Sequence, residues 1–434
     1  MNALMIGHNF AQHSIKSALK RGFINDVSSK HVMPSISYFQ KNQLSPDSNQ
    51  DLWAKKLASP IVNPLRQRFL ALAQHKPTVS VEEGSIRSEL NSIIKQDISQ
   101  AIQMIGTGYP GPYGDLAVLN KCAQHLTHKG LFVSDDELLI NNGVSDGLSR
   151  TLRSLLQTDQ YPEVLTFSPF FKPQASMVNL AHPQAKLVVS DGQKNYFRPS
   201  FNDLNHKITS NSRVLLLTTP HNPTGVVYNV KELTQAIQFC KAHHLYLVID
   251  ATYFDMSQTN CYGDLQQALN NEPYSHIAVI GTNSKLLSAA IRSGWLWTPD
   301  AALRDHIAHG VTVDLAGVSV MASIAMSVTI DHFIELKMAY TQTIDIKNLW
   351  YQCFDELRIQ APAFCQGGLY LTIPTPNQMP GSVFAQLLRD QYDLGVVPFQ
   401  YFVQDEFDDP PFIRVACVNQ PSTQYAIQSY KKFF

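Results

Sequence analysis

The sequence predicts an α/β fold: a large domain with a mainly parallel seven-stranded sheet between helices, plus a small α/β domain from both chain ends. The first observation is a series of short apolar runs that end in turn residues and alternate with helical patterns. Such near-continuous apolar runs are typical of parallel strands buried on both faces. The second is the length of 434 residues, which is long for one domain. The third is a hydrophobic content of 44% with 16% charged residues, as expected for a protein with a substantial core.

The apolar runs give the expected strands of the large sheet. In chain order they are Glu137–Ile140, Glu163–Phe167, Ala185–Ser190, Arg213–Thr219, Leu245–Asp250, His276–Thr282 and Gly294–Pro299. Helix candidates such as Val230–His244 lie between them, and a long helical pattern runs from about Val311 to Gln360. We expect residues 1–100 to form an N-terminal segment and part of the small domain. Residues 101–305 are expected to form the large domain, and residues 306–434 a linker helix and the C-terminal small domain.

Charge and cysteine usage exclude several classes of protein. The formal net charge is -1, which gives no electrostatic attraction for nucleic acid or an anionic membrane. No apolar run of 18 residues exists that could span a bilayer, and the N-terminal residues lack the pattern of a secretory signal. The six cysteines and 15 histidines form no metal-ligand spacing. We therefore expect free thiols, a cytoplasmic location and no metal site.

Polar side chains follow the predicted strands at the points where those strands end. Ligands of open parallel sheets bind at the carboxyl ends of the strands. The residues found there include Gly143, Ser145, Phe171, Asn222, Asp250, Tyr253, Thr282, Ser284, Lys285 and Arg292. Pyridoxal phosphate needs this combination: an amine for its aldehyde, a carboxylate for its ring nitrogen and neutral donors for its ring hydroxyl. Its phosphate needs a helix N-terminus and an arginine, and its flat ring an aromatic face.

Seven motifs between Tyr109 and Arg414 carry a family resemblance. They are "NNGVSDGL", "SPFF", "HNPTG", "DATY", "TNSKLLSAAIRSG", "QGGLYL" and "FIRVA". In this order they resemble the fold-type I enzymes of the aminotransferase class I/II family, which depend on pyridoxal 5'-phosphate (PLP). The resemblance implies a large PLP-binding domain, a homodimer, and transfer of an amino group between an L-amino acid and a 2-oxo acid.

The resemblance also implies the catalytic roles. Lys285 is expected to form the Schiff base with the cofactor aldehyde and then to move protons. Asp250 is expected to pair with the pyridine nitrogen. Asn222 and Tyr253 are expected to hydrogen-bond the ring hydroxyl oxygen, and Phe171 to stack on the ring.

For the phosphate, the resemblance implies the start of a helix at Gly143 together with hydroxyl and guanidinium groups. The expected phosphate ligands are Gly143, Val144, Ser145, Thr282, Ser284, Arg292 and Tyr109. Tyr109 is expected to reach the phosphate of a second subunit, with Tyr113 as a close competitor. The expected substrate ligands are Arg414, for the α-carboxylate, together with Asn222 and Gly84.

The sequence departs from the family pattern in the segments that recognise the side chain of the substrate. Ala290 stands where the family has glycine, and "PFQYF" (Pro398–Phe402) replaces a glycine-containing segment. No proline follows Gly84. The cofactor site therefore follows the family more closely than the substrate site does.

Other interpretations stay open at the level of sequence. Each residue taken singly has an ordinary structural explanation, such as a turn asparagine, a helix cap or a surface charge. "GVSDG" fits a hydrolase nucleophile elbow, with Ser145, Asp250 and a later histidine as a triad. Within the PLP fold, lyase or oxidase chemistry shares the same lysine and aspartate, and a PLP-binding protein without turnover is a further alternative.

Overall fold

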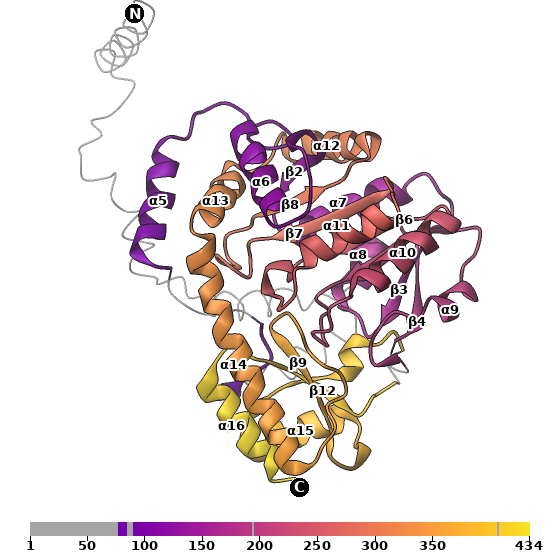
Figure 1. The fold of residues 1–434 in the computed structure, drawn as a ribbon, viewed down its shortest axis with the longest axis vertical. Coiled ribbons are helices and arrows are strands. Elements are labelled where there is room, and N and C mark those ends of the chain that lie inside the picture. Colours follow the sequence, from indigo (N-terminus) through magenta and orange to yellow (C-terminus); the bar gives the residue numbers. More distant parts are fainter. Residues whose placement is uncertain (1–76, 85–89, 193–194, 406–407) are drawn as a thin grey trace, which may run out of the picture. The chain divides into compact units, whose positions relative to one another are not determined.

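All seven predicted strands of the large sheet are present in the computed structural model (Figure 1). The structure describes residues 77–84, 90–192, 195–405 and 408–434. The strands are β2 (Leu138–Asn141), β3 (Glu163–Ser168), β4 (Lys186–Asp191), β5 (Ser212–Thr218), β6 (Tyr246–Asp250), β7 (Ile277–Thr282) and β8 (Gly294–Trp297). Their order across the sheet is β2-β8-β7-β6-β5-β3-β4, and only β8 runs antiparallel to its neighbours. The prediction of a mainly parallel seven-stranded sheet is confirmed.

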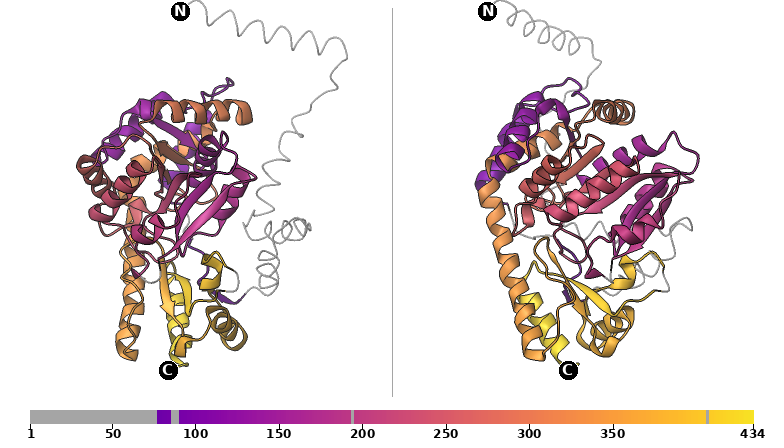
Figure 2. Two further views of the ribbon diagram at one scale, coloured as in Figure 1. Left: turned by 90° about the vertical axis from the view of Figure 1, so that its right-hand side faces the viewer. Right: turned by 45° about the vertical axis from the view of Figure 1, so that its right-hand side comes forward.

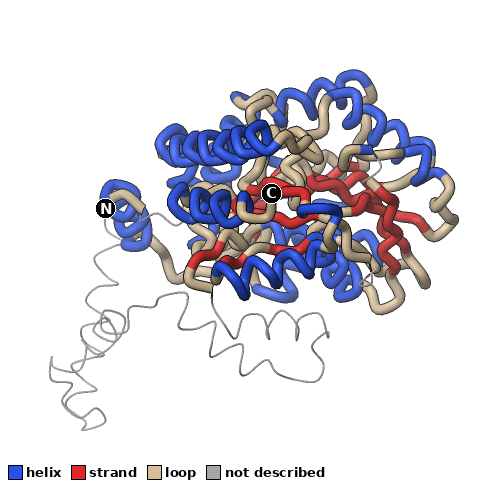
Figure 3. The backbone as a smooth tube through the Cα atoms, turned by 90° about the horizontal axis from the view of Figure 1, so that it is seen from below, coloured by secondary structure: helices blue, strands red, loops and turns tan. Residues whose placement is uncertain are grey.

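Helices lie on both sides of the strands, as Figure 3 shows in blue. Those that accompany the large sheet are α5 (Ser92–Gln103), α6 (Leu116–His128), α7 (Val144–Leu156), α8 (Pro173–Ala181), α9 (Phe201–Asn205), α10 (Val230–Ala242), α11 (Cys261–Asn271), α12 (Ala301–Leu315) and α13 (Val320–Asp331). Helix α10 begins with a capping box in which Asn229 and Glu232 bond to each other's backbone amides.

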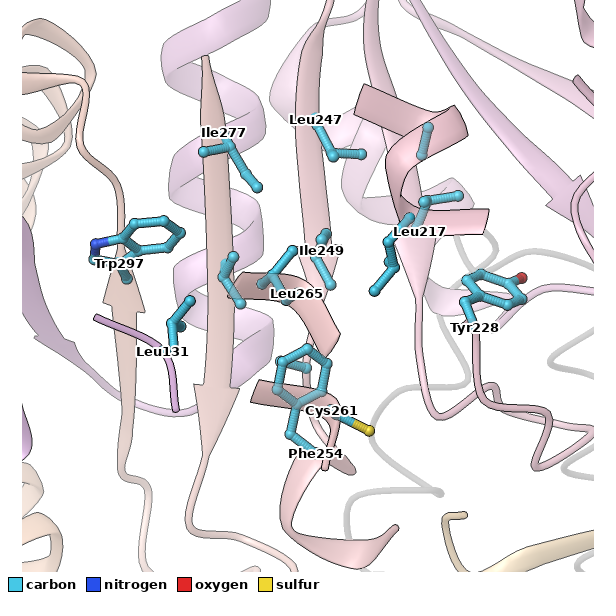
Figure 4. Close-up of a cluster of buried hydrophobic side chains, with 14 of the residues drawn as sticks. Leu131, Leu217, Tyr228, Leu247, Ile249, Phe254, Cys261, Leu265, Ile277 and Trp297 are labelled. Atoms are coloured by element: carbon cyan, nitrogen blue, oxygen red, sulfur yellow. The ribbon is translucent and has the colours of Figure 1, made fainter. Parts of the chain in front are cut away.

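Alternate residues of each central strand pack into different cores because successive side chains of a strand point to opposite faces. In β5, Leu215 and Leu217 belong to one buried cluster, while Val214 and Leu216 belong to another. Helices α6, α10 and α11 contribute to the first cluster, part of which is drawn in Figure 4. Helices α7, α8 and α12 contribute to the second. Because both faces of the sheet are buried, these strands are continuous apolar runs in the sequence.

The small domain combines the start of the described chain with its C-terminal part. Its strands are β1 (Val79–Ser80), β9 (Tyr370–Pro374), β10 (Leu394–Gly395), β11 (Val397–Pro398) and β12 (Phe412–Ala416). Strand β12 lies between β11 and β9 in an antiparallel sheet, and β1 pairs with β10 in parallel. The Val81 amide donates to Gly395 O (3.0 Å), and Val81 is buried in the core of this domain. Both ends of the described part of the chain therefore contribute to the small domain.

The helical pattern from about Val311 to Gln360 corresponds to three helices. Helix α12 ends at Leu315, where Ala316 and Gly317 both have positive φ. Helices α13 and α14 (Phe333–Leu357) follow, and the second half of α14 packs in the small domain with α15 (Gly381–Tyr392) and α16 (Gln420–Lys431) (Figures 1 and 2). A residue at position 317 with a side chain would meet Pro110 O, so glycine is needed where the chain turns.

Helices α12 and α13 contact α7 and α6, which accompany the large sheet. The domain limits near residues 100 and 305 stay a prediction, and residues 1–76 of the predicted N-terminal segment lie outside the described residues. None of the described helices has the length and apolar character needed to cross a membrane.

Candidate active site

The carboxyl ends of β5, β6 and β7 bring three predicted site residues to one edge of the sheet. Asn222 lies in the loop after β5, and Asp250 and Thr282 are the last residues of β6 and β7. The strands are neighbours in the sheet, so these residues come from adjacent positions along its edge. This is the edge at which open parallel sheets bind ligands.

The loop that carries Asn222 is held by its own short contacts. The Gly225 amide donates to His221 O (2.6 Å), and the His221 amide donates to Val226 O (2.8 Å). Gly225 has φ 71°, and a Cβ at this position would collide with the Cys365 sulfur. Burial lowers the pKa of the His221 imidazole to about 4, so the ring is neutral and its Nδ1 lies 2.7 Å from Thr224 Oγ1. Asn222 is thereby fixed and is only 5% exposed.

Asp250 is a buried carboxylate held by neutral donors. Oδ1 accepts from Thr252 Oγ1 (2.6 Å) and from the Thr252 amide (3.1 Å), and Oδ2 accepts from Gln174 Nε2 (3.2 Å). Burial raises the pKa of the carboxyl, while these hydrogen bonds and the charge of Lys285 act in the opposite direction. An ionised carboxylate has about four acceptor positions. Asp250 therefore retains capacity for a further, cationic partner.

Lys285 lies in the loop after β7 and faces the small-domain segment. Its Nζ donates to Gly84 O (2.8 Å) and is 5.9 Å from the centre of the Tyr253 ring. Tyr253 is buried, and burial raises the pKa of its phenol well above 10, with the neighbouring Tyr370 adding to the effect. The predicted lysine, phenol and Gly84 are therefore brought together.

A cradle for an anion forms where helix α7 begins. Gly143 immediately precedes the helix with φ 92° and ψ 167°, a backbone conformation that is almost restricted to glycine. A Cβ at this position would lie 2.5 Å from Arg292 Nη2 and 3.5 Å from Thr282 Oγ1. No side chain of the described residues caps this helix start. The first amides of α7, which belong to Val144 and Ser145, and the Arg292 guanidinium thus serve one site for a negative charge.

Hydroxyl groups complete this cradle. Arg292 Nη1 donates to Ser284 Oγ and to Ala289 O, each at 2.9 Å. Thr282 Oγ1 lies 2.9 Å from Ser284 Oγ and accepts from the Ser284 amide (3.1 Å). The predicted group of Gly143, Thr282, Ser284 and Arg292 is therefore assembled. Ala290, the departure from the family pattern, is an exposed residue of the same loop.

Arg414 lies in β12 and faces the Asn222 loop. Nη1 donates to Asn222 Oδ1 (3.1 Å), and Nη2 donates to Glu82 O (2.5 Å). The side chain is 7% exposed, and Nε is buried without a partner in the described part of the chain. A buried N–H without an acceptor is costly, which favours an anionic ligand at this edge of the guanidinium.

Two predicted ligands lie apart from these contacts. Tyr109 is 89% exposed, whereas its competitor Tyr113 donates from its hydroxyl to Asp305 Oδ1 (3.1 Å). Phe171 is half-buried in the loop between β3 and α8, and its carbonyl accepts from the Gln174 amide. Their roles toward the cofactor stay predictions.

Tyr370 and Gln174 contact site residues but were not predicted. Tyr370 lies in "QGGLYL", a segment that matches the family pattern, yet nothing in the segment distinguishes this tyrosine from a core residue. Its ring centre is 3.9 Å from Arg414 Cζ and 6.0 Å from the Tyr253 ring centre. Gln174 is the second residue of α8, and its buried amide bonds to Asp250, which only the fold could reveal.

The hydrolase alternative has no triad among the described residues. Ser145 is an exposed residue in the first turn of α7. The hydrogen bonds given above for Asp250 come from Thr252 and Gln174. No hydrogen bond among the described residues joins Ser145 to a histidine. A nucleophilic serine requires such a base within hydrogen-bond reach.

An open α/β sheet with a lysine, a buried carboxylate and an anion cradle at its carboxyl edge has the features of a PLP enzyme of fold type I. The chain belongs to the aminotransferase class I and II family, whose profile matches residues 79–429. PLP is the cofactor of this family, and the Gly143 cradle and the remaining acceptor capacity of Asp250 fit its phosphate and ring nitrogen.

Relatives with names of this family align over part of their length. An aspartate aminotransferase from Sulfolobus acidocaldarius is 29% identical over 162 residues, which cover 37% of this chain and 40% of that protein. The glutamate-pyruvate aminotransferase AlaA of Escherichia coli is 25% identical over 194 residues, which cover 44% of this chain and 46% of AlaA. These two alignments span less than half of the relatives' own length.

Solved structures show the same fold over nearly their whole length. An aspartate aminotransferase from Thermotoga maritima superimposes with a TM-score of 0.74 at 18% identity, covering 85% of this chain and 95% of that one. The YbdL protein of Escherichia coli, described as having a methionine aminotransferase function, gives a TM-score of 0.75 at 16% identity, covering 86% and 98%.

Proposed function

We propose that this protein is a PLP-dependent aminotransferase that moves an amino group between an L-amino acid and a 2-oxo acid. The observation that carries the proposal is the buried Arg414, which leaves Nε unpartnered in the described chain while Asn222 links it to the cofactor edge. An α-carboxylate fits a guanidinium that keeps a buried, unpartnered N–H. Both substrates of a transamination carry this group. The family match supports the same reaction.

The positions of the side chains support the following roles. Bound PLP supplies an electron sink for the bond that is broken at the substrate Cα. Lys285 would hold the cofactor aldehyde through its amine and, when free, would move the proton at the substrate Cα. Asp250 keeps the ring nitrogen protonated, because a buried carboxylate with free acceptor capacity stabilises a neighbouring cation.

The ring hydroxyl and the phosphate are bound by separate groups. Asn222 and Tyr253 donate to the ring hydroxyl oxygen, and Phe171 covers the ring. The phosphate is held by the first amides of α7, the hydroxyls of Thr282 and Ser284, and Arg292.

Gly84 positions the free Lys285 amine before the cofactor binds, since its carbonyl accepts from Nζ at 2.8 Å. Gly84 belongs to the small-domain segment, whereas Lys285 follows a strand of the large sheet. The contact therefore connects the small-domain segment directly to the reacting amine.

The reaction is tested by the visible absorbance of the purified holoenzyme. An amino acid added alone should remove the band in one turnover, and a 2-oxo acid added next should restore it. Steady turnover should require both substrates. Release of more than one oxo acid per active site without an acceptor would indicate a lyase, and oxygen consumption would indicate an oxidase; either result would contradict transamination.

We also propose a cytoplasmic homodimer. Exposed apolar side chains near Tyr109, at Ile102, Met104, Ile105 and Leu116, would be covered by a second copy. In that dimer Tyr109 reaches the phosphate of the other subunit. Light scattering should give twice the chain mass, and Tyr109→Phe should weaken PLP binding without changing that mass. The six free cysteines are all buried, which is compatible with a reducing compartment.

A further inference from the structure

Tyr370 lies in β9 of the small domain between two groups of the proposed site. It is 6% exposed. One side of its ring faces Arg414, whose Cζ lies 3.9 Å from the ring centre, and the Tyr253 ring lies edge-on at 6.0 Å and 80°. Gly84 approaches its hydroxyl so closely that a Cβ at position 84 would collide with it. Tyr370 therefore contacts both the substrate-binding and the cofactor-binding parts of the site.

The ring of Tyr370 fixes the plane of the Arg414 guanidinium. Its Nη1 and Nη2 donate to Asn222 Oδ1 and Glu82 O. These two bonds leave the guanidinium plane free to tilt about the line through the two Nη atoms, and packing limits that tilt. Tyr370 supplies the nearer aromatic face, and the Phe402 ring centre lies 5.0 Å from Cζ. A guanidinium stacked on an aromatic ring is stabilised by cation–π attraction. The direction of the unpartnered Nε is thereby set before a carboxylate arrives.

The rings of Tyr370 and Tyr253 meet edge-on, and a side-chain hydrogen bond couples their hydroxyls. Burial opposes ionisation of Tyr370, but the charges of Arg414 and Lys285 and the hydrogen bonds from Tyr253 and Gly84 lower its pKa overall. The pKa of Tyr253 is instead raised well above 10 by burial, with Tyr370 and Asp250 acting in the same direction and Arg414 against it. Tyr253 is therefore the phenol of the pair that holds its proton more strongly, which makes it the donor of the shared hydrogen bond.

We infer that Tyr370 is a positioning residue that acts on both halves of the reaction site: its ring orients Arg414 for the substrate carboxylate, and its hydroxyl competes for the Tyr253 proton. This inference rests on the proposed function, because it assigns Tyr253 to the cofactor hydroxyl oxygen and Arg414 to the substrate. The two contacts come from different parts of one side chain, so two substitutions separate them.

Tyr370→Phe removes only the hydroxyl. Tyr253 then has its proton free for the cofactor hydroxyl oxygen, and a stronger hydrogen bond withdraws negative charge from that oxygen. That negative charge stabilises the protonated nitrogen that would join Lys285 to the cofactor. With less of it, the pKa of this nitrogen falls. We expect the midpoint of the pH titration of the visible absorbance to fall by about 0.5 to 1 pH unit, because a hydrogen bond of about 1 kcal/mol is redirected. Tyr253→Phe should raise the midpoint, and acetate binding should stay within about twofold in Tyr370→Phe.

Tyr370→Leu removes the aromatic face as well. Acetate, a carboxylate that cannot react, should then bind the holoenzyme about tenfold more weakly, measured by its effect on the visible band. The KM for the amino acid should rise by a similar factor, and kcat should change less.

Tyr340→Phe is the matched control. Tyr340 is buried in the same cluster as Tyr253 and Tyr370, but its hydroxyl has no partner in the described part of the chain. Neither the pH midpoint nor acetate binding should change in this variant. Circular dichroism compares the folding of all variants.

The outcomes distinguish this inference from the proposed function. A yellow wild-type protein whose midpoint is unchanged in Tyr370→Phe, or whose acetate binding is unchanged in Tyr370→Leu, overturns the role of Tyr370 and leaves the proposed function intact. A wild-type protein that takes up no PLP overturns both. A rise of the midpoint in Tyr370→Phe would also contradict the inference, because it would mean that Tyr370 strengthens the hydrogen bond of Tyr253 to the cofactor.

Discussion

Replacing Gly143 with alanine is expected to weaken cofactor binding while leaving the protein folded. The new Cβ would lie 2.5 Å from Arg292 Nη2, well inside contact distance, so the guanidinium must move away from the start of α7. Losing one charge-assisted hydrogen bond to the phosphate costs about 1.5–3 kcal/mol, which corresponds to roughly a 10- to 150-fold higher Kd for PLP. The backbone at φ 92° and ψ 167° adds strain of about 1–3 kcal/mol for a residue with a side chain.

The Gly143 prediction is measured by titrating the apoenzyme with PLP and following the visible band. Gly310→Ala is the control: Gly310 lies inside α12, and its Cβ would meet only Arg153 Nη2 at an ordinary 3.5 Å. That substitution should leave the Kd unchanged and favour the helix slightly. A Gly143→Ala protein that binds PLP within about twofold of the wild type would refute the placement of the phosphate at this helix start.

Three further predictions concern buried groups. Asp250→Asn should lower kcat by about 150- to 5000-fold at saturating PLP, because the ring nitrogen loses a buried ionic partner worth about 3–5 kcal/mol. Unchanged kcat would show that Asp250 does not contact the cofactor. Lys347→Met should lower the unfolding free energy by about 2–3 kcal/mol in guanidinium titrations, since the buried Nζ donates to Gly367 O (3.0 Å) and Gly368 O (2.6 Å). An unchanged denaturation midpoint would contradict this. Burial lowers the pKa of His125 and of His221 from 6.5 to about 4. Because the unfolded chain binds these protons first, the stability from each histidine is fully present above pH 6.5 and decreases as the pH falls toward 4. The loss reaches about 2 kcal/mol per histidine at pH 5. Melting temperatures between pH 7 and 5 should fall less in His125→Leu, and an unchanged slope would contradict the assignment.

The sequence predicted the parts of the structure that depend on local pattern. The apolar runs became β2 to β8 because strands buried on both faces need apolar residues at every position. Asn222, Asp250 and Thr282 were predicted to converge because parallel strands end at one edge of their sheet. Gly143 was identified because a glycine before a helix, next to a strand end, is typical of a phosphate site.

The contacts that were missed depend on tertiary structure. Tyr370 faces Arg414 because β9 and β12 pair with Tyr370 opposite Ala416 and Arg414 opposite Thr372, a register that only the folded small domain fixes. Gln174 reaches Asp250 from a helix on another part of the chain, 76 residues away. The break after α12 follows from Gly317 lying against Pro110, whereas the helical periodicity continues on both sides of it.

The assignment of Lys285 is tested most directly by reducing the holoenzyme with borohydride and mapping the labelled peptide. We predict one PLP per chain, attached to Lys285, whose Nζ lies 2.8 Å from Gly84 O at the carboxyl edge of the sheet. Lys285→Ala should lose the trapped cofactor entirely. Attachment to another buried lysine, such as Lys129 or Lys347, or a protein that retains the label in Lys285→Ala, would contradict the site described above.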